Sequence, residues 1–226
     1  MNLLLTNLHL ARLPLFPLPG TVFFPNTLLP LHVFEPRYRA LTQHCIDRQW
    51  PLAVVLIEPG HEGEQAGTPP LAQLAGIGHL VMHDRLTDGR FNIMVQGLSR
   101  VQILEELPPN GSGYRTARAQ LVSDYVHPDR ELLLRKTHSV RSALTSLVAR
   151  DRKIAQMVSE PLFGTRSPAV LADALSALVF VDPAKRQELL ANTRVHERLD
   201  QVLVRLTDLL ALSSLAGAFG AGSEVN

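Results

Sequence analysis

The spacing of hydrophobic positions divides the chain near residue 123. Before that position the apolar runs are short and are interrupted by glycine and proline, a pattern typical of strands and tight turns. After it, glycine is nearly absent until the C-terminal end, and apolar residues recur every three or four positions, as they do along one face of a helix. The pattern predicts an α+β protein in which a strand-rich part precedes a helical part.

The opening segment, residues 13–38, holds six of the sixteen prolines, although most of its other residues are apolar. Proline removes a backbone donor and fixes φ, so a helix is not expected before Pro36. Disordered proline-rich tracts are polar, whereas this segment is apolar. It should therefore be buried as short extended pieces joined by turns, with strands at 22–24 and 27–33.

The rest of the first part alternates between strand and turn signals. Asp88-Gly89 supplies the positive φ that a tight hairpin needs, and Pro36 suits the first position of a helix. The expected elements are a helix at 36–48, strands at 52–57, 77–84, 91–96, 101–107 and 114–121, a bulge at Gly97, and polar turns at 59–70 and 108–113.

Helix signals dominate the second part. Ser167-Pro168 and Asp182-Pro183 each join an N-cap residue to a proline at the first helical position. Residues 211–226 are small and rich in glycine, so a frayed end is expected there. The expected helices span 127–150, 151–158, 168–180 and 183–191, and a last one begins after Thr193.

Composition and charge narrow the class of protein. The chain has 226 residues, of which 46% are hydrophobic and 19% charged, so it can bury a full core. Its net charge of +1 gives no general attraction for a polyanion. Cys45 is the only cysteine, which excludes an internal disulfide and fits a reducing compartment. Its helical neighbourhood favours a buried filler over a nucleophile.

Nothing in the sequence directs the chain to a membrane. The N-terminus has neither the basic region nor the length of a signal peptide. No apolar run reaches the roughly 20 residues that a membrane span requires. A cytoplasmic location without a membrane partner is therefore expected.

The histidine spacing does not predict a metal site. His79 and His83 are four residues apart on an expected strand, where they would lie roughly 13 Å apart, too far for one ion. His61 stands with Glu62 and Glu64 in a polar loop, where solvated side chains are the simpler interpretation. We expect neither a metal nor another cofactor.

A series of short motifs runs in order along residues 10–210. They are Leu13-Pro14-Leu15, Phe16-Pro17-Leu18, Val22-Phe23-Phe24-Pro25, Pro30-Leu31, Val33-Phe34-Glu35-Pro36-Arg37-Tyr38, Gly76-Ile77-Gly78, Asp88-Gly89-Arg90, Val95-Gln96-Gly97-Leu98-Ser99-Arg100-Val101, Lys185-Arg186-Gln187-Glu188-Leu189-Leu190 and Glu197-Arg198-Leu199. Together they resemble the N-terminal domain of the Lon protease family. The Phe-Glu-Pro-Arg-Tyr form of one motif resembles the bacterial stand-alone version of that domain.

The resemblance implies a fold and a role. The implied fold is a PUA-like β-barrel over residues 8–122 followed by a C-terminal helical bundle over 123–212, which leaves a flexible tail at 213–226. In the full-length protease this region helps to recognise substrates and to organise the oligomer. The resemblance therefore implies protein recognition, and it leaves a homo-oligomer open.

The catalytic parts of the full-length protease find no counterpart in the sequence. A phosphate-binding loop needs a lysine directly after a glycine, and none of Lys136, Lys153 and Lys185 has one. The Ser-Lys protease domain has no matching segment, and no G-x-S-x-G motif is present. We expect the chain not to be an enzyme, so that an ATP-dependent protease label would rest on homology alone.

The resulting hypothesis is a non-catalytic module that binds unfolded or extended protein segments, as an adaptor in protein quality control. The candidate protein-binding residues are Phe23, Phe24, Phe34, Glu35, Arg37 and Tyr38. For Phe23 and Phe24 the alternative is a place in the core, and for Glu35 and Arg37 an ion pair within the fold.

Two other functions stay open. PUA-like folds often bind RNA, and arginines flank the first helix and the hairpin: Arg37, Arg39, Arg48, Arg85, Arg90 and Arg100. Only 5% of the residues are aromatic, however, which gives little support for base stacking, so nucleic acid is not the favoured partner. An extended ligand would add to an exposed sheet edge or lie in the groove between barrel and helices. The other alternative is an enzyme of unknown type that uses this groove.

Overall fold

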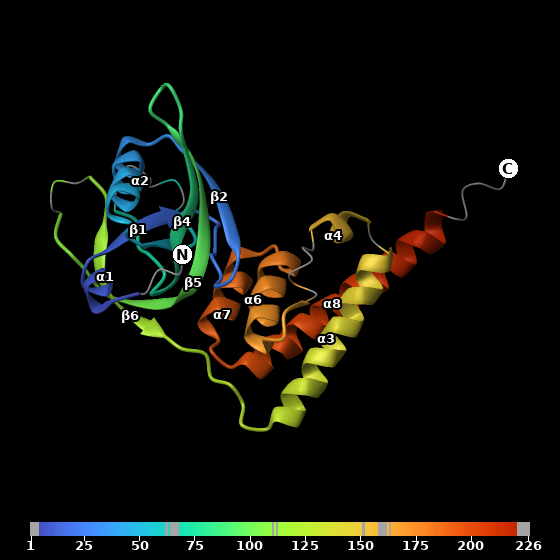
Figure 1. Ribbon diagram of the computed structural model, residues 1–226. Coiled ribbons are helices and arrows are strands. Elements are labelled where there is room, and N and C mark those ends of the chain that lie inside the picture. The colour runs from blue at the N-terminus through green and yellow to red at the C-terminus, as the bar shows by residue number, and fades with distance from the viewer. Residues whose placement is uncertain are drawn as a thin grey trace. The chain divides into compact units, whose positions relative to one another are not determined.

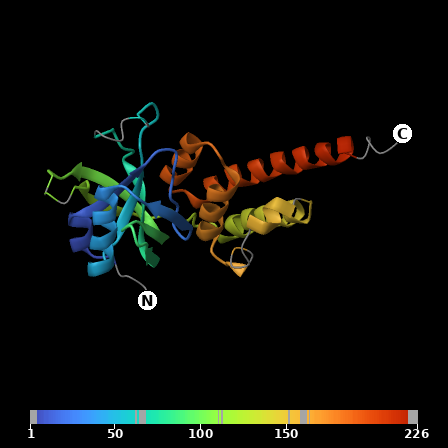
Figure 2. The same ribbon diagram turned by 90° about the horizontal axis from the view of Figure 1, so that it is seen from above.

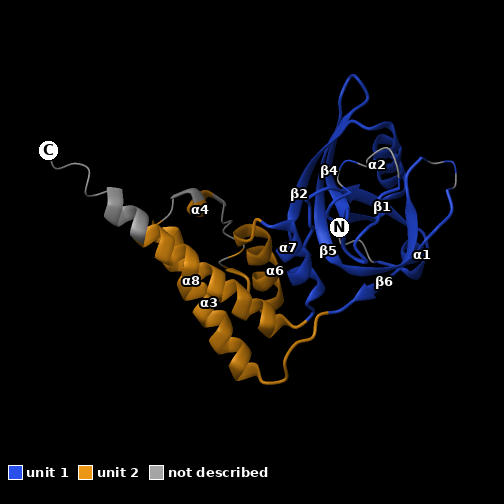
Figure 3. Ribbon diagram, turned by 180° about the vertical axis from the view of Figure 1, so that it is seen from behind, with its two compact units in different colours: residues 1–123, 182–193 blue, residues 124–181, 194–226 orange. Residues whose placement is uncertain are grey.

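The computed structural model describes residues 5–61, 63, 68–109, 111, 113–150, 152–157, 162 and 164–220 (Figure 1). The chain forms two compact units (Figure 3). The first contains residues 1–123 and 182–193, and the second contains residues 124–181 and 194–226.

The first unit is built on six strands, which Figure 1 shows curled into a barrel. Their order is β2-β5-β4-β3-β1-β6, and a further pairing of β5 with β6 closes the barrel. Only the β1–β3 pair is parallel among the named strands. The strands are β1 (Leu13–Leu18), β2 (Leu28–Val33), β3 (Leu52–Leu56), β4 (Leu74–Arg85), β5 (Phe91–Glu106) and β6 (Thr116–Val122). The predicted barrel is thereby confirmed.

Strand β5 explains how the barrel closes. The first half of β5 pairs with β2 and its second half pairs with β6, so one continuous strand pairs with two successive neighbours. The sequence predicted two strands separated by a bulge at Gly97. Gly97 pairs with Gly78 and Ser99 pairs with Ile77, which leaves Leu98 as the extra residue. The bulge is confirmed, and it bends one strand instead of ending it.

Phe23 and Phe24 lie in the core, and the expected strand at 22–24 is absent from the described structure. Only 1% of Phe23 and 0% of Phe24 is exposed. A Cβ on Gly76 would collide with the carbonyl oxygen of Phe23, and one on Gly97 with that of Phe24. The segment thus lies against glycines of β4 and β5, close enough to exclude any side chain there. Burial removes both phenylalanines from the predicted binding site.

Two helices of the first unit come from the N-terminal part of the chain. Helix α1 (Asn7–Ala11) was not predicted, and a reciprocal capping box between Thr6 and His9 begins it. Helix α2 (Pro36–Arg48) matches its predicted bounds, with proline at its first position. It buries Cys45, and burial raises the pKa of this thiol to about 12.

Helix α7 (Pro183–Ala191) also belongs to the first unit, although it follows most of the second unit in the sequence. The side-chain amide of Gln187 donates to the carbonyl of Leu74 at 2.8 Å, and Arg100 Nε donates to the carbonyl of Leu190 at 2.8 Å. The sequence placed this helix in a bundle at 123–212. Its apolar spacing identified it as a helix but could not say which surface it covers.

The second unit is a bundle of helices around its own core. They are α3 (Arg130–Arg150), α4 (Arg152–Met157), α6 (Pro168–Val179) and α8 (Val195–Gly220). Helices α3 and α8 run side by side in Figures 1 and 2. Lys136 contacts Asp200, and Arg150 bonds Ser214, so the two helices are parallel. No helix among the described residues is long and apolar enough to cross a membrane.

A buried ion cluster joins the start of this unit to two of its helices. The guanidinium of Arg198, with none of its side chain exposed, lies 2.8 Å from Asp124 and 3.3 Å from Asp173.

The ends of two helices also bear on the predictions. The predicted N-cap of α6 is present, since the side chain of Ser167 accepts a hydrogen bond from the amide of Val170. Helix α8 continues through residues 213–220, the first part of the predicted flexible tail. Residues 221–226 lie outside the described residues.

Candidate functional site

A pocket of about 220 Å³ opens on the first unit beside the end of β1. Four of the predicted binding residues, Phe34, Glu35, Arg37 and Tyr38, line it together. The other lining residues come from the end of β1, from the residue after it and from three more distant segments: Pro17, Leu18, Pro19, Ile57, Pro69 and Arg115. Its walls are therefore mainly apolar, with three prolines and two aromatic rings, and its charged groups are few.

The edge of β1 at this pocket is poorly suited to pair with another strand. β6 stops pairing with β1 where the amide of Leu15 donates to the carbonyl of Arg115 at 2.9 Å. The next residue of β1 that faces the same way is Pro17, because backbone direction alternates along a strand. Pro17 has no N–H, and its carbonyl already accepts from the Tyr38 hydroxyl at 3.2 Å. At Pro17 the free edge therefore offers no backbone donor, and its carbonyl is already engaged by Tyr38.

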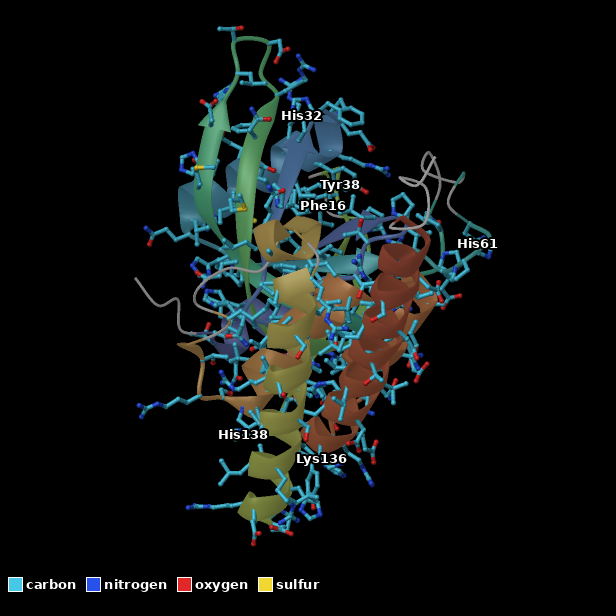
Figure 4. The ribbon with its side chains drawn as sticks, turned by 90° about the vertical axis from the view of Figure 1, so that its right-hand side faces the viewer. Phe16, His32, Tyr38, His61, Lys136 and His138 are labelled. Carbon is cyan, nitrogen blue, oxygen red and sulfur yellow. The ribbon has the colours of Figure 1, made fainter. Side chains whose placement is uncertain are left out.

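Tyr38 forms the floor of the pocket. Its ring stacks on Phe16 at 4.2 Å between ring centroids, with 15° between the ring planes (Figure 4). Burial raises the pKa of the Tyr38 hydroxyl, the neighbouring Arg37 opposes this, and Glu35 adds to it. The hydroxyl therefore stays protonated at neutral pH and keeps its hydrogen bond to Pro17.

Glu35 and Arg37 form an ion pair on the pocket wall. Nε of Arg37 donates a hydrogen bond to Oε2 of Glu35 at 2.9 Å, and Nη2 of Arg37 lies 2.8 Å from the same oxygen as an ion-pair contact. The arginine carbon Cζ lies 4.6 Å from the centre of the Tyr38 ring, within reach of a cation–π interaction. Between a quarter and a third of each side chain is exposed, at 27% for Arg37 and 29% for Glu35. The pair is thus held in place and still accessible.

Arg115 also lines the pocket, and the sequence alone did not identify it. Its Nη1 donates to the carbonyl of Pro69 at 2.8 Å, while Nε and Nη2 bond the two carboxylate oxygens of Glu106 at 2.6 and 2.5 Å. Arg115 thereby fixes the position of Pro69 beside β6. No local motif marks it, because its neighbours in the pocket are distant in the sequence.

Phe34 is the most exposed large apolar side chain at the pocket, at 60%. It directly precedes the N-cap residue of α2, and the helix that follows holds it there. Of the six predicted binding residues, four thus line one pocket, while Phe23 and Phe24 are in the core.

Of the residues considered for other chemistry, only Arg37 lines the pocket. His79 and His83 are on β4, as predicted, and the described residues contain no group of three or more His, Cys, Asp or Glu side chains placed to hold a metal. Of the arginines considered for RNA, Arg37 pairs with Glu35, Arg90 pairs with Asp88 at 2.6 Å, and Arg100 is buried. The pocket itself can accept an apolar side chain and offer hydrogen bonds beside it.

Residues 12–208 match the family model of the "ATP-dependent protease La (LON) substrate-binding domain". The chain belongs to this family. All residues that line the pocket fall within the matched part of this LON substrate-binding domain. The match is to the substrate-binding domain alone, and it includes no ATPase and no protease domain.

Similar proteins agree with the assignment. The chain is 30% identical to Lon protease 2 of Herpetosiphon aurantiacus over 201 residues, which are 87% of the chain and 24% of that protein. It is 26% identical to the Lon protease of Anaeromyxobacter dehalogenans over 207 residues, 90% of the chain and 24% of that protein. The LON domain described here thus spans about a quarter of the length of these relatives.

Two solved structures share the fold. The Lon N-terminal domain protein from Xanthomonas campestris superposes with a TM-score of 0.58 at 23% identity, covering 86% of this chain and 98% of that one. The N-terminal domain of the Mycobacterium avium complex Lon protease gives a TM-score of 0.66 at 17% identity, covering 87% and 98%. The predicted fold class is therefore confirmed.

Proposed function

We propose that this chain is a non-catalytic recognition module that binds unfolded or extended segments of other proteins and serves as an adaptor in protein quality control. The observation that carries the proposal is the pocket that gathers Phe34, Glu35, Arg37 and Tyr38. Membership of a substrate-binding family supports protein as the ligand.

The size of the pocket favours one large apolar side chain as its occupant. At about 220 Å³ it exceeds the roughly 150 Å³ cavity that holds benzene in a protein core. It lies below the approximately 300–1,000 Å³ of typical small-molecule and cofactor sites. Folded proteins bury most of their large apolar side chains, whereas unfolded or extended segments expose them. The pocket therefore favours unfolded or extended segments over folded proteins, because only the former have a large apolar side chain free to enter it.

The mode of binding follows from the strand edge. Addition of a strand to β1 needs backbone donors, and Pro17 has none. The ligand binds instead by inserting a side chain between Phe34 and the proline walls. Affinity then depends mainly on buried apolar area and only weakly on salt.

A direct test compares two exposed residues of the same unit. Phe34 and Leu28 are both 60% exposed, but only Phe34 lines the pocket. The probe is fluorescein-labelled α-lactalbumin, reduced and carboxymethylated so that it stays unfolded, with native α-lactalbumin as its folded counterpart. Phe34→Ala should weaken binding of the unfolded probe at least about fivefold, the effect of losing a contact worth about 1 kcal/mol. Leu28→Ala should leave it unchanged.

Several results would contradict the proposal. Equal binding of native and unfolded probe would remove the preference for extended segments. Equal binding by both variants would move the site elsewhere. RNA recovery that falls steeply with salt, without binding of the unfolded probe, would favour the RNA alternative. Hydrolysis of ATP or of the probe by the purified chain would contradict a non-catalytic role, and an unchanged rate of probe degradation by a Lon protease on adding the chain would contradict the adaptor role.

A further inference from the structure

The Glu35–Arg37 pair has hydrogen-bonding capacity that the fold does not use. The hydrogen bond from Nε of Arg37 and the ion-pair contact from its Nη2 both end on Oε2 of Glu35, so Oε1 of Glu35 and Nη1 of Arg37 have no hydrogen-bond partner among the described residues. Oε1 of Glu35 is an acceptor and Nη1 of Arg37 is a donor, and both belong to side chains that line the pocket.

An extended polypeptide presents the complementary pair of groups. In a strand, the N–H and the C=O of one residue point to the same side, which is how paired residues exchange two hydrogen bonds. A surface that reads an extended segment through its backbone must therefore offer an acceptor and a donor side by side. The β1 edge cannot do so at Pro17.

We infer that Glu35 and Arg37 together replace the missing strand edge: Oε1 of Glu35 accepts from one backbone N–H of the bound segment, and Nη1 of Arg37 donates to the C=O of the same residue. The inference rests on the proposed function of the pocket. It names the ligand feature that is read, a peptide backbone next to the inserted apolar side chain.

The pair is organised before the ligand arrives. Arg37 stacks on Tyr38, Tyr38 stacks on Phe16, and the Tyr38 hydroxyl bonds Pro17. Little side-chain freedom remains to be lost on binding, which lowers its entropic cost. Since every polypeptide carries the same backbone, the pair adds affinity for extended segments of many sequences, and the pocket alone selects a side chain.

The experiment uses peptides that lack one backbone donor. The probe is a fluorescein-labelled, end-capped peptide of serine and glycine with one central leucine, compared with versions N-methylated at the leucine or at either neighbour. The test variant Glu35→Ala/Arg37→Met removes one charge of each sign and keeps the arginine stem. The matched control, Asp88→Ala/Arg90→Met, removes an ion pair of the same spacing from the β4–β5 hairpin. Thermal unfolding establishes that each variant is folded.

In the unchanged protein and the control, N-methylation at one position should weaken binding at least about fivefold, the loss expected for about 1 kcal/mol. In Glu35→Ala/Arg37→Met this penalty should disappear. A penalty that persists in the test variant, or the absence of a penalty at every position, overturns the backbone inference while Phe34-dependent binding still upholds the proposed function. If Phe34→Ala leaves peptide binding unchanged, the proposed function is overturned. If the unmethylated peptide does not bind, the proposed function and the backbone inference are both overturned.

Discussion

Arg100 Nε donates a hydrogen bond to the backbone carbonyl of Leu190, 2.8 Å away and ninety residues later in the chain. Only 2% of Arg100 is exposed, so the bond forms in the interior of the first unit. It ties strand β5 to the end of helix α7. A long-range contact of this kind makes the stability of the barrel depend on a helix from the other half of the sequence.

Replacing Arg100 by methionine should destabilise the protein by about 2 kcal/mol, because the stem still fills its space while a buried carbonyl loses a charged donor. Urea unfolding measures the loss, and amide exchange in α7 should speed up in the folded protein. Arg118→Met is the matched control, since Arg118 is 58% exposed where it pairs with Glu105. A loss as small as that of the control would show that α7 is held by other contacts.

Arg198 should be the most sensitive ionic position of the second unit. Arg198→Met leaves Asp124 and Asp173 close together without their shared cation, and Asp173 is only 1% exposed. Removing one partner from a buried ion pair typically costs about 3–5 kcal/mol. Arg194→Met, at a position 62% exposed, should cost about 0.5 kcal/mol or less. Similar midpoints of urea unfolding for the two variants would refute this assignment.

Gly97 should not tolerate a methyl group. A Cβ there would meet the carbonyl oxygen of Phe24, and backbone atoms cannot move aside as a flexible side chain can. We expect Gly97→Ala to lose at least about 2 kcal/mol of stability, as overpacked cores do. A Cβ on Gly63 would have no atom within 4 Å, so Gly63→Ala should stay within about 0.5 kcal/mol. Equal urea unfolding curves for Gly97→Ala and Gly63→Ala would mean that the backbone at Phe24 can shift to make room for the added methyl group.

Cys45 should be unreactive in the native protein. It is 2% exposed, and burial raises the pKa of its thiol to about 12, so almost no thiolate exists at about pH 8. A thiol reagent that absorbs on reaction should therefore label the native chain at the rate of unfolding and label the chain in guanidinium chloride at once. Rapid labelling of the native chain would reopen the nucleophile interpretation.

Acid should weaken the fold through His9 and His44. The centroids of their rings lie 4.6 Å and 5.8 Å, respectively, from that of the Trp50 ring. Burial lowers the pKa of each below the ordinary 6.5, and Arg48 lowers that of His44 further. The unfolded chain therefore takes up protons first as the pH falls below 6.5. The stabilisation that the two neutral histidines contribute is therefore complete above pH 6.5 and is lost progressively as the pH falls below it.

The measurement is urea unfolding at about pH 7.5 and about pH 5.5, followed by the fluorescence of Trp50, the single tryptophan. The double variant His9→Gln/His44→Gln should lose less stability on acidification than the unchanged protein. Some dependence will remain, because burial lowers the pKa of His79 as well. An equally steep decline in the double variant would assign the effect to other groups.

The sequence predicted helices better than strands, for a physical reason. Helix starts carry local chemistry, such as Pro36 or Asp182-Pro183, and the observed starts of α2 and α7 match it. The extent of α8 was underestimated because a small, glycine-containing end resembles a frayed one. Its partner α3 contacts it as far as Ser214, and local composition does not contain that contact.

Strand assignment failed where the partner decides the structure. Leu13–Leu18 forms β1 despite two prolines, because β3 pairs with one edge and β6 with only its first residues. Val22, Phe23 and Phe24 have strand-forming side chains, but they lie against glycines and form no ladder. Pairing is a property of two segments, and one sequence window contains only one of them.

The candidate site shows the same division. Phe34, Glu35, Arg37 and Tyr38 were predicted because they form one continuous motif, and they do line one pocket. Pro69 and Arg115 were missed because only the barrel topology brings them to that wall.

The return of α7 to the first unit has a consequence for how the protein is made. The polypeptide passes between the units after residues 123, 181 and 193, so a ribosome synthesises α3, α4 and α6 before α7. Until then the carbonyl of Leu74 and the guanidinium of Arg100 lack the partners that α7 provides. The barrel is the first part to emerge and yet cannot mature before α3, α4 and α6 of the second unit have been made. A gene fragment that stops at residue 123 would therefore encode an unfinished barrel.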